Sequence, residues 1–203
     1  MLSKTQALHY WNYAEILNEQ LANTTRFVEP HPSNLKTFSL EYTRIILSAG
    51  SEIEVVCRLI CGEIDPSCSY TSSDNRADMG KIAKKIQTSI PHIYNAKMEI
   101  SSTSQTIFPF SVWKHSPASN LTWWEDYNLI KHYRHNEFSR ATLENAMSCV
   151  AALMILVSYL YTIVTRKTTP RLTRNGMFDS VYACLGLALQ PAEKLPDIES
   201  FIC

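Results

Sequence analysis

Apolar residues recur at helical spacing through two long stretches in the first third of the chain. The first stretch runs from Thr5 to about Thr25, and the second runs to about Cys61. Ser33 or Asn34 is the candidate N-cap of the second helix, and Gly62 is its candidate stop. A segment containing two prolines separates the stretches and breaks the pattern. The pattern predicts two consecutive amphipathic helices.

The middle of the chain changes character. After a Ser- and Asp-rich loop, residues 76–89 predict a short helix. The following residues, about 91–120, are rich in Pro, Ser and Thr and contain two short extended segments, at 97–100 and 105–108. An excursion of this length inside a compact domain is typical of a functional lid or a partner surface, although packing alone would also explain its aromatic residues.

Helical spacing returns near Trp123, with Asn120 or Thr122 as the candidate cap, and from Phe138 it continues to about Thr165. Only five Gly occur in 203 residues, which argues against a β-rich fold. We therefore expect an all-α, up-and-down helical bundle of about five helices, folded as one domain over residues 1–203. The insertion at about 91–120 is irregular or short-stranded. A C-terminal extension covers about 170–203, where residues 177–189 predict a terminal helix.

Composition narrows the class of protein. The chain has 19 basic and 19 acidic residues, so attraction to nucleic acid has to come from a local patch. The N-terminal stretch lacks the uninterrupted apolar run of a secretory signal, and we expect a cytoplasmic protein with its six Cys reduced. Cys57, Cys61 and Cys68 fit either a metal site or small buried side chains. No His or further Cys completes a ligand spacing, so we predict no metal and no cofactor.

The segment from Ala146 to Thr165 carries no charge over about the length that spans a bilayer. Two interpretations fit: a membrane span, or the central helix of a bundle that is buried nearly all round. Ser148, Ser158, Thr162 and two Tyr make it more polar than a typical span. The sequence favours the central helix over a membrane span, and we do not expect a membrane partner.

The most informative polar segment precedes this long helix. On a helix, Asn128 and His132 share a face, and Lys131 lies beside them. With Arg134 and His135 they form a local positive site suited to a phosphate or to developing negative charge. His132 is the candidate for proton transfer in this segment. Cations at a helix C-terminus also favour the helix dipole without any function, so a solvated helix end is the alternative.

One carboxylate interrupts the second apolar stretch. Glu52 falls on or beside the apolar stripe, where a buried carboxylate needs a partner. Two interpretations remain open: Glu52 reaches solvent at the edge of the stripe, or it orients a basic group from another helix.

The segment Tyr127-Asn128-Leu129-Ile130-Lys131-His132, followed by a long apolar helix, resembles the signature of the HEPN superfamily of small helical bundles. That signature is an Arg followed after four to six residues by a His, often written Arg-Asn-x-x-x-His. Here Tyr127 stands where the family has Arg, and Arg134 is the candidate replacement. The resemblance implies a metal-independent ribonuclease or RNA-binding protein that works as a homodimer, as in toxin–antitoxin or phage-defence systems.

Carried over to this chain, His132 takes the proton-transfer role and Asn128 gives polar support. Arg134 completes the catalytic candidates, Lys131, Tyr127 and His135 are candidates for substrate contact, and Glu52 is a supporting residue. Gly-rich phosphate loops, nucleophile elbows, zincin helices and dinucleotide fingerprints are absent from the sequence.

A non-catalytic interaction module is the second hypothesis. In it the Asn, His and Lys side chains are structural and tied to Glu52, while the insertion with Phe110 and Trp113 contacts a protein partner. Burial separates the two hypotheses: an accessible His132 favours chemistry, and a buried His132 paired with Glu52 favours structure.

Overall fold

The computed structural model describes residues 1–71, 78–100, 102–103, 105–116, 120–167 and 176–182. Within these ranges it contains five α-helices and a small sheet, which confirms a helical bundle with a short-stranded insertion. The helices are α1 (Lys4–Asn23), α2 (Leu40–Ile64), α3 (Met79–Ser89), α4 (Thr122–Glu137) and α5 (Leu143–Thr165).

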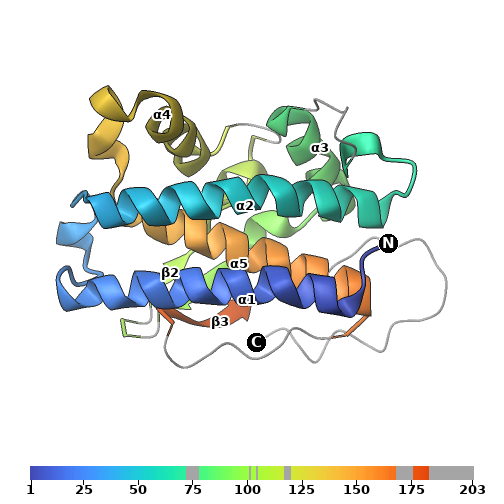
Figure 1. Cartoon of the computed structure of the whole chain (residues 1–203), viewed down its shortest axis with the longest axis horizontal. Helices are drawn as coiled ribbons and strands as arrows, with labels where there is room; N and C mark the ends of the chain where they lie inside the picture. Colours follow the sequence, from blue (N-terminus) through green and yellow to red (C-terminus); the bar gives the residue numbers. More distant parts are fainter. Residues whose placement is uncertain (72–77, 101, 104, 117–119, 168–175, 183–203) are drawn as a thin grey trace.

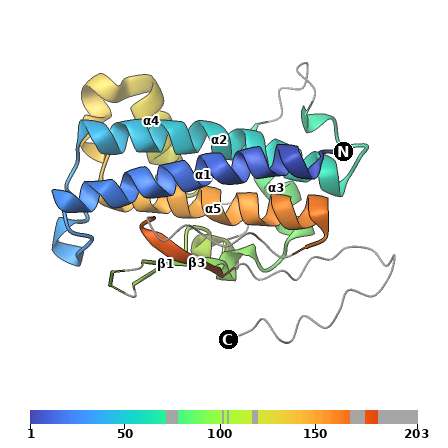
Figure 2. The same ribbon diagram turned by 60° about the horizontal axis from the view of Figure 1, so that its bottom comes forward.

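Three long helices lie side by side along the longest axis of the molecule (Figure 1). α1 runs opposite to α2 and α5, and α5 packs mainly against α2 and α1. α3 and α4 cover α2 from the other side, and the strands lie beneath α5 (Figure 2). The core therefore centres on α5.

Short polar side chains fix where the helices begin, because they accept hydrogen bonds from otherwise unpaired N–H groups of the first turn. Ser3 forms a capping box with Gln6, and Thr142 caps α5. The cap of α2 is Ser39, which accepts from the N–H of Tyr42. The predicted caps were wrong: Ser33 and Asn34 belong to a short 3-10 turn (Pro32–Asn34) that precedes α2. Gly62 does not stop α2, which continues to Ile64.

The apolar composition of α5 follows from its place in the fold. By length and composition α5 is the single helix in the described part of the chain that could cross a membrane, and most of it is buried inside the bundle. A buried hydroxyl on α5 is accommodated within the helix: Ser158 is fully buried and its Oγ donates to the carbonyl of Met154 at 2.7 Å. The structure thus shows α5 as the central helix of the bundle.

The insertion forms most of the sheet. β1 (Lys97–Ile100) pairs antiparallel with β2 (Thr106–Ile107), close to the two predicted extended segments. The other edge of β1 pairs antiparallel with β3 (Phe178–Tyr182), giving the order β2-β1-β3. The prediction of a terminal helix over 177–189 was wrong for residues 178–182, because they supply backbone pairing to β1. Residues 183–189 lie outside the described ranges.

A buried amide connects β3 to the helices. The Asn18 side chain on α1 donates from Nδ2 to the carbonyl of Phe178 and accepts at Oδ1 from the N–H of Phe178, both at 3.0 Å. Gly176 passes so close that an added Cβ would lie 2.1 Å from Asn18 Nδ2. Asn18 therefore holds the C-terminal strand against the bundle.

Candidate functional site

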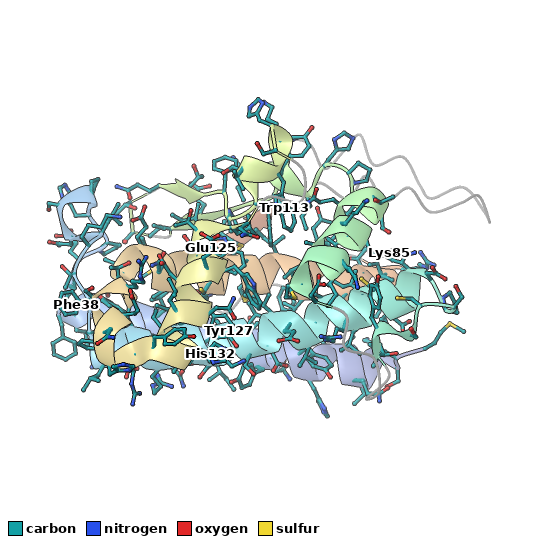
Figure 3. All side chains as sticks on the ribbon, turned by 90° about the horizontal axis from the view of Figure 1, so that it is seen from above. Phe38, Lys85, Trp113, Glu125, Tyr127 and His132 are labelled. Atoms are coloured by element: carbon teal, nitrogen blue, oxygen red, sulfur yellow. The ribbon has the colours of Figure 1, made fainter. Side chains whose placement is uncertain are left out.

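α4 crosses α2 and carries most of the predicted site residues (Figure 3). Its first half buries Trp123, Asp126, Tyr127 and Ile130. At Tyr133 the backbone leaves helical geometry, with φ −131° and ψ 29°, and the helix kinks. Beyond the kink the chain passes through a 3-10 turn (Phe138–Arg140) into α5.

Tyr127 faces the core. It is 1% exposed, and its ring lies so close to the backbone of α2 that a Cβ added to Gly50 would be 2.3 Å from Cδ2. The ring of Trp124 packs on it at a centroid distance of 4.9 Å. This packing places Tyr127 between α4 and α2. The ammonium group of Lys131 lies near the same ring, with Nζ 5.5 Å from the ring centroid. Glycine at position 50 is required because the aromatic ring occupies the space of a side chain.

The basic run Lys131, His132, Arg134 and His135 is exposed. Within the described ranges none of these side chains forms an ion pair. His132 contacts the ring of the exposed Tyr133, with centroids 6.3 Å apart. The run therefore presents cationic side chains and one aromatic ring to solvent.

Asn128 and His132 share a face of α4, as the sequence predicted, but no hydrogen bond joins them in the described structure. Asn128 is half-buried and donates from Nδ2 to the carbonyl of Trp124 at 2.9 Å. That bond fixes the amide and leaves Oδ1 as the atom that can accept from a ligand or from His132.

Glu52 lies elsewhere. It is half-buried on α2, and burial raises the pKa of its carboxyl group. Tyr10 of α1 has a raised hydroxyl pKa. Burial of Tyr10 is the main cause, and the negative charge of Glu52 is the second. No hydrogen bond or ion pair joins Glu52 to His132 in the described structure. The Glu52–His132 pair that the interaction-module hypothesis expects is therefore not formed.

Sequence reasoning missed a second polar cluster on the other flank of α4. Asp126 is 7% exposed and receives Arg140 Nη1 on Oδ1 at 2.6 Å and Asn145 Nδ2 on Oδ2 at 2.7 Å. Asn145 also donates to the carbonyl of Arg140 at 2.8 Å. Glu137 accepts a hydrogen bond from Arg140 Nε. The bonds of Arg140 to Glu137 and to Asp126 hold the pKa of its guanidinium above the ordinary value. The available signal was Asp126 itself, an acidic residue within the apolar stripe of α4.

This network borders a polar cleft between the start of α4, the 3-10 turn and the first turns of α5. The cleft has a volume of about 370 Å³. Thr122, Ser139, Ser148 and the Lys36–Glu144 ion pair complete its rim. Its size lies within the range of small-molecule sites.

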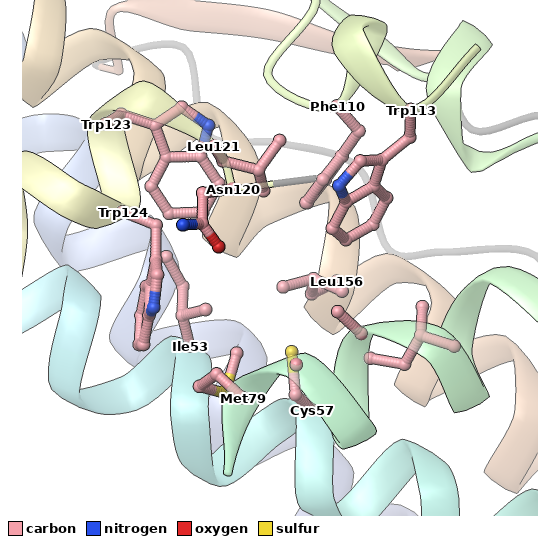
Figure 4. A pocket seen from close by; sticks show the side chains of 13 residues that line it. Ile53, Cys57, Met79, Phe110, Trp113, Asn120, Leu121, Trp123, Trp124 and Leu156 are labelled. Carbon is pink, nitrogen blue, oxygen red and sulfur yellow. The ribbon is translucent and has the colours of Figure 1, made fainter. Parts of the chain in front are cut away.

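The aromatic residues of the insertion are buried. Phe110 and Trp113 are 2% and 7% exposed, and they pack on each other and, through Phe110, on Trp123. With Cys57 and Leu156 they line an apolar cavity of about 60 Å³ (Figure 4). An engineered cavity of about 150 Å³ binds benzene, so this one is too small for an aromatic ligand. The large apolar side chains that the described part of the insertion exposes are Phe108 and Val112.

Cys57, Cys61 and Cys149 are buried in the core. Burial raises the pKa of Cys61 to about 12 and raises the pKa values of Cys57 and Cys149 still further. In the described part of the chain no group of three His, Cys, Asp or Glu side chains is placed to hold a metal ion. Cys57 and Cys61 therefore act as small apolar side chains.

Comparison with known proteins gives no relative: no family model, no curated protein and no solved structure matches the chain.

Proposed function

We propose that this chain is a HEPN-like cytoplasmic protein that binds RNA and cleaves it without a metal ion. The observation that carries the proposal is the exposed basic run from Lys131 to His135, whose side chains have no ion-pair partner among the described residues. In a chain of zero net charge, four adjacent cationic or titratable groups concentrate positive potential at one end of one helix. Phosphate contacts from Lys and Arg supply most of the affinity for nucleic acid.

The exposed ring of Tyr133 favours single-stranded RNA as the substrate. It stands between His132 and Arg134 and is 56% exposed. Aromatic rings stack on unpaired bases, whereas flanking cations follow the backbone, and this combination is typical of single-strand binding.

In the proposed reaction His132 removes the proton from a ribose 2′-hydroxyl. The resulting oxygen attacks the adjacent phosphorus, the bond from phosphorus to the 5′-oxygen breaks, and water protonates the leaving oxygen. The products are a 2′,3′-cyclic phosphate and a free 5′-hydroxyl. Arg134 and Lys131 stabilise the charge that develops on the phosphate oxygens, and Asn128 Oδ1 is the candidate acceptor that orients His132.

We also propose that the active form is a homodimer, as the HEPN resemblance implies. Apolar side chains are exposed at the same end of the bundle as the basic run: Phe38 is 49% exposed and Leu40 is 73% exposed. Phe38 packs on Phe138, directly beyond α4, with ring centroids 5.4 Å apart. Burial of these side chains in a second copy would stabilise association.

The test is incubation of the purified protein in EDTA with a pool of structured RNAs that contain single-stranded loops, beside a His132→Ala variant. His9→Ala is the matched control, because His9 is also exposed on a helix. We expect cleavage by the parent and by His9→Ala, with cyclic phosphate ends, and no cleavage by His132→Ala of the same oligomeric state. Equal cleavage by both variants, or none by the parent, would overturn the catalytic role of His132.

The second candidate function is a non-catalytic protein-interaction module. The observation that favours it is the pair of exposed apolar side chains on the insertion, Phe108 and Val112, each 43% exposed and on either side of the buried Phe110 in the sequence. This candidate predicts that the parent protein binds no RNA even at low salt, where phosphate contacts are strongest.

A further inference from the structure

The polar cleft beside α4 contains an unused hydrogen-bond acceptor. Asn145 is 9% exposed, and both N–H groups of its amide are occupied, by Asp126 Oδ2 and by the carbonyl of Arg140. Two acceptors around Nδ2 fix the orientation of the amide. Oδ1 then accepts no hydrogen bond from a described residue, and it is not one of the fully buried polar atoms. A carbonyl oxygen that is fixed in orientation and accessible can accept a hydrogen bond from a ligand in the cleft.

A second polar atom lies one turn further along α5. Ser148 is three residues beyond Asn145, shares its face and also lines the cleft. Its hydroxyl has no hydrogen-bond partner among the described residues. Trp123, on α4, also lines the cleft and is 6% exposed.

The cations around the cleft are paired with carboxylates. Arg140 is paired with Asp126 at 2.6 Å and with Glu137, and at the rim Lys36 is paired with Glu144. Three carboxylates beside two cations make the cleft unsuitable for a free phosphate or carboxylate group. It suits an uncharged, planar, polar group that offers a donor to Asn145 Oδ1 and an apolar face to Trp123.

We propose that this cleft binds a nucleobase carrying an exocyclic amino group, and that it selects the base next to the phosphate held by the basic run. The inference rests on the proposed function, which supplies RNA as the substrate. The amino group donates to Asn145 Oδ1, the ring lies against Trp123, and Ser148 bonds a ring nitrogen or carbonyl. Asp126 and His132 are six residues apart on α4, a rise of about 9 Å, so one RNA strand spans both sites.

The first test compares cytidine with uridine, which are similar in size and shape but differ in the amino group. Titration of the parent protein, followed by the NMR signal of the Asn145 side-chain amide and by calorimetry, should show cytidine binding at least about tenfold tighter than uridine. Equal affinities, or no binding of either nucleoside at millimolar concentration, would overturn the proposal.

A second test uses variants to ask whether cytidine binds in the cleft. Ser148→Leu fills it from α5, and Ser139→Leu fills it from the opposite rim, so the test does not depend on one variant folding. Ser51→Leu on the exposed surface of α2 is the matched control. We expect cytidine affinity to fall by about tenfold or more in the two cleft variants and to stay unchanged in the control. Equal affinity in all three would overturn the proposal.

The outcome is separable from that of the proposed cleavage. His132→Ala should lose cleavage but bind cytidine as the parent does, because the two sites lie on different flanks of α4. Cytidine binding in a parent protein that cleaves no RNA would reject the nuclease and support the cleft. Cleavage without preference for cytidine, adenosine or guanosine over uridine at the cut, unchanged by Ser148→Leu, would reject the cleft and leave the nuclease.

Discussion

The two halves of α4 differ in the burial and pairing of their charged residues. In the first half, Asp126 is buried and both of its carboxylate oxygens are bonded, to Arg140 and to Asn145. In the second half, beyond Ile130, the basic side chains are exposed and form no ion pair with a described residue. A buried charge has to be paired for the fold to be stable, whereas an exposed charge contributes little. The second half therefore has charges that the fold does not need and that a ligand can use.

The largest effect should come from Tyr127, the anchor of the first half. Tyr127→Ala removes a buried aromatic side chain, and we expect it to lower the free energy of unfolding by about 3–5 kcal/mol, measured by urea denaturation. Tyr127→Phe is the control and should cost far less.

Gly50 provides a direct check on this contact. Gly50→Ala in the parent places a methyl group against the Tyr127 ring and should destabilise by about 1–3 kcal/mol. In the Tyr127→Ala background the same substitution should cost much less, because the ring is gone. Additive effects in this double-mutant cycle would show that the contact does not form.

Asp126 should give the next largest effect. Asp126→Ala leaves a buried Asn145 amide and the partly exposed Arg140 without their partner, and we expect a loss of about 1–3 kcal/mol. Thermal unfolding followed by circular dichroism is the measurement. Glu125→Ala, at an exposed neighbouring position, is the control and should stay near the parent. Equal stability of both variants would mean that the network does not hold α4 to α5.

A smaller, pH-dependent effect is expected from the ion pair of Asp65 with Lys85, which joins the end of α2 to α3. Lys85, followed by hydrogen bonds from Ser67, lowers the pKa of Asp65 from its ordinary 3.8 to about 2. A lowered folded-state pKa stabilises the fold above pH 3.8, and this contribution disappears as the pH falls toward 2. The Tm deficit of Lys85→Met should therefore shrink over that range, whereas Lys84→Met should show no such pH dependence.

The smallest effect on stability should come from the basic run itself. Single Ala substitutions at Lys131, His132, Arg134 and His135 should change the free energy of unfolding by no more than about 0.5 kcal/mol, because these side chains are exposed. A loss comparable to that of Asp126→Ala at any of these positions would contradict the contrast between the two halves of α4.

Much of the fold was predictable because helical periodicity depends on local spacing. The uncharged run of α5 and the face of α2 indicated a bundle, and the two extended segments of the insertion indicated its strands. The start of α2 was missed because several polar residues precede it, and only the backbone path selects Ser39 as the cap. Strand β3 was missed because its pairing with β1 is a contact across some eighty residues, which periodicity does not encode.

The candidate site was predictable to a similar degree. The exposed basic run was found from its residue types, and its position on a helix was correct. The kink at Tyr133 and the distance of Glu52 from His132 depend on tertiary packing. The network of Asp126, Arg140 and Asn145 was missed for the same reason, since its members come from α4, the 3-10 turn and α5.

The salt dependence of RNA binding tests the central claim most directly. Affinity for a single-stranded RNA would be measured over a range of salt concentrations for the parent and for the double variant Lys131→Ala/Arg134→Ala, after thermal unfolding has shown that both are folded. The account predicts weaker binding by the double variant and a slope of log K against log salt that is smaller by about 0.7 for each lost phosphate contact. Identical affinity and slope in the two proteins would show that the unpaired charges of α4 do not bind RNA.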